Sequence, residues 1–211
     1  MTISLINTGK RFNRDWIFRH LNFQFSAGMA YAITGPNGSG KSTLLQVIAG
    51  ALSPNEGKVE YLVKNDQTQT GNPLSPENVY LHLSIAAPYL ELIEEMTLHE
   101  FLHFHRQFKP LLTSVPIPDI IALIGLEKAA HKQIRYFSSG MKQRVKLAQS
   151  VFSNTPVLLL DEPCTNLDAE GIALYQRLIT TYCKDRLIIV SSNDETEYTF
   201  CSEQLNINSY K

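Results

Sequence analysis

A glycine-rich segment early in the chain has the composition of a phosphate-binding loop. Residues 35–42 are Gly-Pro-Asn-Gly-Ser-Gly-Lys-Ser, which matches the pattern G-x-x-x-x-G-K-[ST]. Its glycines allow backbone N–H groups to surround phosphate oxygens at the start of a helix, where the helix dipole also favours anions. The expected binding residues are Gly35, Pro36, Asn37, Gly38, Ser39, Gly40, Lys41, Ser42 and Thr43.

Three side chains at the end of this segment have separate expected roles. Lys41 would reach the β and γ phosphates, the Ser42 hydroxyl would ligate Mg²⁺, and Thr43 would bond the α phosphate. A dinucleotide-binding fingerprint fits less well, because Thr43 stands where that pattern requires its third glycine. We therefore expect a nucleoside triphosphate with Mg²⁺ as the ligand.

Two carboxylates follow the apolar run 157–160 directly. Because parallel α/β sheets bind their ligands beyond the carboxyl ends of the strands, Asp161 and Glu162 are in a position for chemistry. Asp161 would hold Mg²⁺ and Glu162 would polarise the attacking water as general base. An isolated Asp-Glu pair before a proline is more often a solvated turn, so this prediction depends on the phosphate-binding loop upstream.

Apolar periodicity indicates the elements that must position these residues. Strands are expected at 3–5, 21–25, 30–34, 58–63, 79–85, 157–160 and 187–190, and helices at 41–51, 97–108, 120–124 and 142–152. The helix at 97–108 is amphipathic, with Leu98, Phe101, Leu102 and Phe108 on one face. The polar stretch 64–76 is typical of an exposed loop, which we interpret as a plain surface hairpin with no functional role.

Composition excludes several classes of function. The 211 residues carry 19 basic and 20 acidic side chains and a net charge of -1, so no nucleic-acid partner is expected. No apolar run reaches the roughly 18 to 20 residues that span a bilayer, and no secretion signal opens the chain. Three widely separated cysteines fit thiols in a reducing cytosol. We expect a cytoplasmic protein.

A third motif lies between the first two and carries a family resemblance. Residues 137–141 are Phe-Ser-Ser-Gly-Met, and residues 163–168, Pro-Cys-Thr-Asn-Leu-Asp, follow the acidic pair. Together these motifs resemble the ATP-binding cassette (ABC) family over essentially the whole chain. The family signature is Leu-Ser-Gly-Gly-Gln, so Ser138 and Gly140 match it and the other three residues depart from it. A serine and a flexible backbone at a helix N-terminus still suit an anion.

The resemblance implies a fold and a set of domain boundaries. It implies an α/β P-loop NTPase with a RecA-like core, an N-terminal antiparallel β subdomain and a helical insert, all within one ABC ATPase domain at 1–211. Residues 1–87 and 153–211, approximately, would form the core with the β subdomain. Residues 88–152, approximately, would form the helical subdomain that carries the signature.

The resemblance also implies a dimer and further site residues. Two cassettes pack head to tail, so that the signature of one covers ATP held by the P-loop of the other. Asp168 matches the loop aspartate that crosses this interface. Phe12 stands about where an aromatic ring stacks on adenine, and Trp16 is the alternative.

Two departures from the family pattern bear on catalysis. Residues 84–88, Ser-Ile-Ala-Ala-Pro, lack the glutamine that touches Mg²⁺ and the membrane partner. Asn193 replaces the histidine that holds the γ phosphate. Asparagine donates a hydrogen bond but carries no charge, so we expect a site that binds ATP well and turns it over slowly.

The function implied is an ATP-binding and ATP-hydrolysing subunit of an ABC transporter. It would power separate transmembrane permease subunits from the inner face of the membrane, together with a second cassette. Two alternatives remain open: a soluble cassette ATPase of a non-membrane complex, and an ATP-gated module with little or no hydrolysis. These motifs do not specify the transported substrate or the direction of transport. They also do not specify whether the dimer is a homodimer or a heterodimer.

Overall fold

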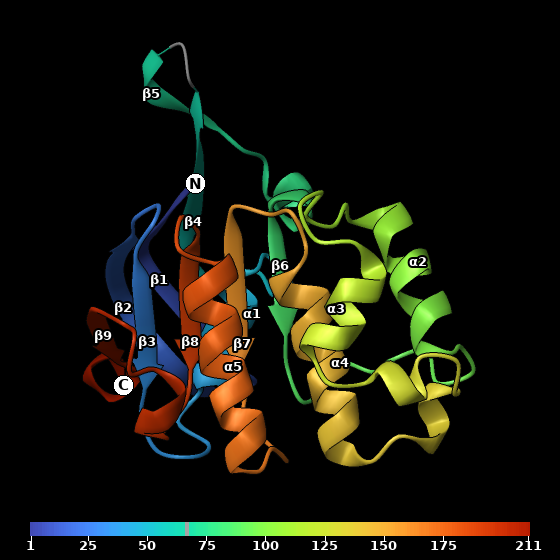
Figure 1. The fold of residues 1–211 in the computed structure, drawn as a ribbon. Helices are drawn as coiled ribbons and strands as arrows, with labels where there is room; N and C mark the ends of the chain where they lie inside the picture. The colour runs from blue at the N-terminus through green and yellow to red at the C-terminus, as the bar shows by residue number, and fades with distance from the viewer. Residues whose placement is uncertain (66–67) are drawn as a thin grey trace. The chain divides into compact units, whose positions relative to one another are not determined.

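The computed structural model describes residues 1–65 and 68–211 and divides into two compact units (Figure 1). The core unit comprises Met1–Leu83, Thr155–Asp161 and Asp185–Lys211. The helical unit comprises Ser84–Asn154 and Glu162–Lys184. The segments of each unit are far apart in the sequence, so each unit forms only when distant parts of the chain pack together.

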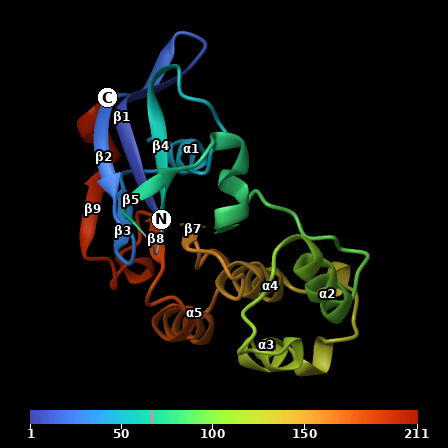
Figure 2. The same cartoon turned by 90° about the horizontal axis from the view of Figure 1, so that it is seen from above.

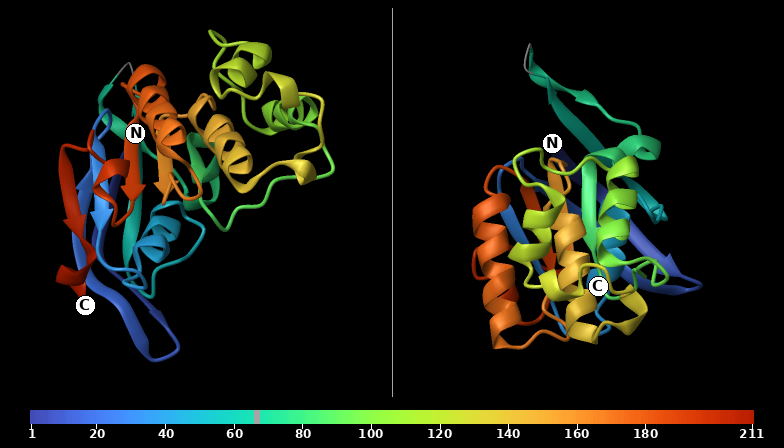
Figure 3. Two further views of the ribbon diagram at one scale, coloured as in Figure 1. Left: turned by 60° about the horizontal axis from the view of Figure 1, so that its bottom comes forward. Right: turned by 45° about the vertical axis from the view of Figure 1, so that its right-hand side comes forward.

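An antiparallel sheet of four strands is formed by the N-terminal part of the chain, within the core unit. Its order is β2-β1-β4-β5, with β1 at Thr2–Phe12, β2 at Asp15–Phe25, β4 at Glu56–Asn65 and β5 at Thr68–Pro73. The long β1–β2 hairpin is visible in blue in Figure 3. It turns at Asn13, whose φ of 53° lies in the left-handed region that asparagine tolerates.

Strands β4 and β5 test the prediction for residues 64–76. Leu62 pairs with Pro73 and Val63 with Asn72, so the expected hairpin is confirmed for the described residues. Polar residues can form such a strand because the backbone supplies the ladder of hydrogen bonds. Positions 66 and 67 lie outside the described residues.

The second sheet carries the central strands in the order β6-β7-β8-β3-β9. Its strands are β3 (Ala30–Thr34), β6 (Leu83–Ala86), β7 (Val157–Asp161), β8 (Leu187–Ser191) and β9 (Glu203–Asn206). The pairs β3–β8, β3–β9 and β7–β8 are parallel, and every residue of β7 and β8 is buried. Helix α1 (Lys41–Ile48) follows β3 and packs on β7 and β8. The predicted α/β class with an N-terminal antiparallel sheet is confirmed.

The strand predicted at 79–85 is wrong over most of its length. A 3₁₀ helix, η1, occupies Pro76–His82, and only Leu83–Ala86 is a strand. Pro76 favours the turn because its ring fixes φ and it has no N–H for a sheet ladder. Val79 is buried while Tyr80 and Leu81 are 60% and 52% exposed, so only part of this apolar run lies in the core.

The helical unit contains α2, α3, α4 and α5 (Figure 2). Their bounds are Leu98–Phe108, Ile117–Leu123, Ser139–Val151 and Ala169–Tyr182, with short 3₁₀ helices η2 at Glu127–Ala129 and η3 at Ile134–Tyr136. A capping box of Thr97 and Glu100 starts α2. Phe108 is 70% exposed and packs on Phe104, so the predicted apolar face of this helix is not buried at its last residue. Among the described residues, no helix is long and apolar enough to cross a membrane.

The short 3₁₀ helices η4 (Glu195–Glu197) and η5 (Ile207–Tyr210) complete the core unit. Helix η5 follows β9 and packs against β2. The methyl group of Ile207 would meet a Cβ added at Gly35, at 2.9 Å. The last residues of the described chain therefore lie against the glycine-rich segment.

Candidate nucleotide-binding site

The glycine-rich segment forms a tight turn between β3 and α1 in the core unit. Gly35, Gly38 and Gly40 have φ values of 147°, 74° and 101°, a region that disfavours other residues. A Cβ at Gly35 would lie 2.8 Å from the Ser39 hydroxyl, and a Cβ at Gly40 would overlap the Ile17 side chain. Only glycine therefore fits these two positions without rearrangement.

The first turn of α1 offers its backbone donors to a ligand. Gly40 is the N-cap residue and provides no side-chain hydrogen bond, and the first turn contains no acidic residue. The first N–H groups of any helix have no partner within the helix, and the positive end of its dipole lies there. Ser42 and Thr43 are half-buried in this turn. The arrangement suits a phosphate group.

Lys41 is 5% exposed, and its ammonium lies against the turn that it follows. Its Nζ donates to the carbonyl oxygens of Gly35 at 2.9 Å and Pro36 at 3.2 Å. A lysine ammonium has three donors and no acceptor, so the same group can exchange these carbonyls for phosphate oxygens. A second lysine, Lys211, donates to the Ser39 carbonyl at 2.8 Å.

Asp161 ends β7 as a buried carboxylate. It is 1% exposed, and neither carboxylate oxygen has a hydrogen-bond partner among the described residues. An uncompensated buried charge is costly, so such a group normally pairs or binds a metal. A carboxylate and a serine hydroxyl are hard oxygen ligands, which Mg²⁺ prefers. Asp161 and Ser42, both in the core unit, therefore fit a magnesium ion.

Glu162 follows Asp161 with an unusual backbone conformation. Its φ of 42° lies in the left-handed region, which non-glycine residues seldom occupy. Strain of this kind persists only where the surrounding structure holds it in place, and it clusters at functional sites. The Thr165 N–H donates to the Glu162 carbonyl at 3.2 Å and so closes a tight turn.

The two aromatic candidates at the β1–β2 hairpin have different surroundings. Phe12 is 47% exposed near the tip, with the Lys10 ammonium 5.4 Å from its ring centroid. Trp16 is half-buried, and the guanidinium groups of Arg19 and Arg11 lie 4.5 Å and 5.4 Å from its ring centroid. Trp16 is therefore enclosed by neighbours of the same sheet, and Phe12 has more surface for stacking.

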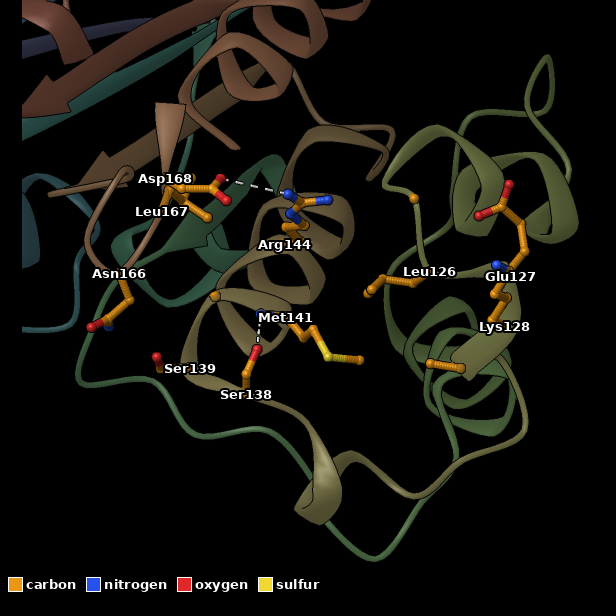
Figure 4. A pocket seen from close by; sticks show the side chains of 13 residues that line it. Leu126, Glu127, Lys128, Ser138, Ser139, Met141, Arg144, Asn166, Leu167 and Asp168 are labelled. Carbon is orange, nitrogen blue, oxygen red and sulfur yellow. Dashed lines mark hydrogen bonds and ion pairs between the residues drawn. The ribbon is translucent and has the colours of Figure 1, made fainter. Parts of the chain in front are cut away.

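The helical unit contains a cavity of about 760 Å³ that collects the remaining site residues (Figure 4). Ser138 caps α4 by accepting from the Met141 N–H at 3.3 Å. Asp168 caps α5 by accepting from the Gly171 N–H at 2.8 Å. Its carboxylate Oδ1 lies 3.7 Å from the Arg144 guanidinium Nη2. A Cβ at Gly140 would stand 3.0 Å from the Asn166 carbonyl. The structure therefore brings Ser138, Gly140 and Asp168 to one cavity.

Comparison with known proteins assigns the family. A sequence model of the family described as ABC transporter matches residues 18–165. The cytochrome c biogenesis ATP-binding export protein CcmA of Rhizobium etli is 32% identical over 202 residues, which cover 92% of this chain and 89% of the relative. The chain belongs to the ABC transporter family. This cassette is an ATP-binding subunit, and the predicted resemblance is confirmed.

Another relative supports this assignment, and solved structures share the fold. The uncharacterized ABC transporter ATP-binding protein YybJ of Bacillus subtilis is 28% identical over 208 residues, covering 98% of this cassette and 92% of the relative. A putative ABC transporter ATP-binding protein of Pyrococcus furiosus superposes with a TM-score of 0.81 at 19% identity over 100% of both chains. A dimeric bacterial cassette gives 0.77 at 21% identity over 97% and 94%. These structures confirm the predicted P-loop NTPase fold.

The loop after β6, where the family glutamine is missing, is held by lysines of α4 within the helical unit. Lys146 donates to the carbonyls of Ala87 at 3.4 Å and Pro88 at 2.9 Å, and Lys142 pairs with Glu94. Burial lowers the pKa of Lys146, an effect that Glu91 opposes. These contacts were not predicted from the sequence. The available signal was two lysines one helical turn apart, opposite an acidic loop.

Asn193, the other departure, follows β8 on the core unit. The Ser192 N–H donates to the Ile33 carbonyl of β3 at 3.1 Å, so the segments after β8 and β3 leave the sheet side by side. The Asp194 N–H donates to the Ser192 hydroxyl at 2.9 Å and fixes the turn. Asn193 is exposed. It follows β8, the neighbour of β3 in the sheet, and the phosphate-binding segment follows β3.

Proposed function

We propose that this cassette hydrolyses MgATP to power separate transmembrane permease subunits, paired with a second cassette. The observation that carries the proposal is the buried, unpartnered Asp161 carboxylate, in the same unit as a glycine turn with open helix donors. Relatives named as ATP-binding export proteins favour export. A subunit that powers separate permeases with ATP would lie at the inner face of the membrane.

Each residue has a role in this proposal. The amides of 35–41 and the Lys41 ammonium bind the triphosphate, and Phe12 stacks on adenine. Ser42 and Asp161 would hold Mg²⁺, which would neutralise phosphate charge when bound. Glu162 accepts a proton from the attacking water, and Asn193 donates a hydrogen bond to the γ phosphate. Ser138, Gly140 and Asp168 of the second cassette complete the site.

Phosphate release by the purified wild-type chain tests the enzymatic part of the proposal. We expect steady release from ATP with Mg²⁺ and none after EDTA is added. Because the family works with permeases, we also expect a multi-span membrane protein to co-purify with the cassette from native membranes. Release without such a partner would favour the cassette ATPase of a soluble complex. Binding of ATP without release would refute hydrolysis.

Asn193 favours a second candidate function, an ATP-gated module with little turnover. The neutral amide gives weaker support to developing charge than a cationic imidazole, because charge-assisted hydrogen bonds are about twice as strong as neutral ones. Asn193→His is therefore expected to raise the ATPase kcat about fivefold, corresponding to roughly 1 kcal/mol, with little change in ATP affinity.

Steady-state kinetics checks this expectation, with Asn193→Gln as a control that keeps a neutral amide. A rate of Asn193→His equal to that of the wild type would show that position 193 does not limit turnover. A wild-type rate no higher than that of Glu162→Gln would favour the gated module over the motor.

A further inference from the structure

A buried glutamine on α4 contacts the turn that follows Glu162. Gln143 is 3% exposed, and its Nε2 donates to the Pro163 carbonyl at 2.7 Å. Both residues belong to the helical unit and stand 20 positions apart in the sequence. The other buried side chains of α4 are mostly apolar, so a buried amide here is costly unless it is bonded.

The turn that receives this bond begins with the strained residue. Glu162 has φ of 42°, and Pro163, which comes next, is buried. Pro163 has no N–H of its own, so its carbonyl is its one backbone group that can anchor the turn. Hydrogen bonds from Thr165 N–H to the Glu162 carbonyl and from Leu167 N–H to the Cys164 carbonyl extend the same turn. The Gln143 bond ties this turn to a helix.

We infer that Gln143 is a positioning residue for Glu162: its amide fixes the Pro163 carbonyl and thereby the direction of the catalytic carboxylate. This inference rests on the proposed hydrolysis. A left-handed conformation at a non-glycine residue persists only where its surroundings enforce it. General-base catalysis requires the carboxylate within hydrogen-bond reach of the attacking water, so a small rotation at Glu162 lowers the rate.

The position of Gln143 adds a link to the signature turn. Ser138 caps α4, and Gly140 lies in the first turn of that helix. A Cβ added at Gly140 would lie 3.0 Å from the Asn166 carbonyl oxygen. Gln143 follows Gly140 by one turn of the same helix. One helix, α4, therefore carries both the signature residues Ser138 and Gly140 and the glutamine that contacts the turn after Glu162.

Two substitutions test the inference by steady-state phosphate release. Gln143→Leu keeps the approximate volume and removes the donor, and it is expected to lower kcat about tenfold with KM for ATP within twofold of wild type. Gln149→Leu, on the same helix and half-buried, is the matched control and is expected to leave both constants unchanged.

The pH dependence of kcat in Gln143→Glu distinguishes a positioning role from a merely structural one. An ionised carboxylate cannot donate to the Pro163 carbonyl, whereas a protonated carboxyl can. The kcat of Gln143→Glu relative to wild type at the same pH should therefore rise as the pH falls from 8 towards 6, about fivefold. If Gln143→Leu fails to fold, this profile still decides.

A double substitution separates action through Glu162 from a general loss of structure. In a Glu162→Gln chain, Gln143→Leu should cause no further loss of the residual rate. An equal tenfold loss in both backgrounds, or a wild-type kcat in Gln143→Leu, overturns the inference while hydrolysis stands. A wild-type chain that releases no phosphate refutes hydrolysis instead, and this inference with it.

Discussion

A Glu162→Gln chain should bind MgATP as tightly as the wild type and turn it over about 10² to 10⁴ times more slowly. The substitution keeps the shape of the side chain and its ability to hydrogen-bond, but the amide cannot accept a proton at neutral pH. Glu162 does not belong to the glycine turn that binds the phosphates, so affinity should persist. The left-handed φ of 42° should also persist, because the backbone turn is unchanged.

Single-turnover phosphate release measures the rate, and fluorescence of Trp16, the one tryptophan of the chain, reports nucleotide binding near the β1–β2 hairpin. Glu170→Gln is a suitable control, because Glu170 is an exposed carboxylate in the first turn of α5. A Glu162→Gln chain with wild-type turnover would remove Glu162 from the reaction. Dimer formation by this variant in MgATP, followed by sedimentation, would support closure of two cassettes on ATP.

Those parts of the fold that depend on local composition were predictable. β3, at Ala30–Thr34, was predicted to the residue, and β7 and β8 each extend one residue beyond their predictions. Strands buried on both faces read as continuous apolar runs, which end where the polar site residues begin. The phosphate-binding segment was predictable for a similar reason, because its glycines satisfy backbone requirements that act within seven residues.

Elements whose burial depends on distant partners were harder to predict. Helix α5 was not predicted, although Leu174, Tyr175, Leu178 and Ile179 recur at helical spacing and are buried. Phe108 lies on the predicted apolar face of α2 but is 70% exposed, so the packing of that face does not extend to its last residue. Helical periodicity identifies a face and does not say how far along the helix a partner extends.

Contacts that hold the site together were also invisible in the sequence. Gln143 meets Pro163 across 20 positions, and Lys146 meets Pro88 across 58. Such bonds depend on how α4 packs within the helical unit, and a single polar residue on a helix carries no pattern that reveals its partner. The missing glutamine was visible from the sequence, whereas the lysines that hold the same loop required the structure.

Replacement of Asp161 by asparagine should separate the stability of this cassette from its function. Without Mg²⁺, Asp161→Asn should raise the free energy of unfolding by about 1 to 3 kcal/mol, because it removes an uncompensated buried charge. The same change should lower ATP turnover about 10²-fold or more, since the magnesium ligand is lost. Urea denaturation in EDTA and phosphate release in Mg²⁺ measure the two effects.

Asp185→Asn is the matched control, because Asp185 is an exposed carboxylate of the same core unit and should affect neither quantity. MgATP should stabilise the wild type against urea more than it stabilises Asp161→Asn, because binding to the folded state adds to stability only where the ligand set is complete. A destabilised Asp161→Asn in EDTA would mean that the carboxylate is satisfied by another group. Opposite changes in stability and turnover would instead identify Asp161 as a group retained for its metal and not for the fold.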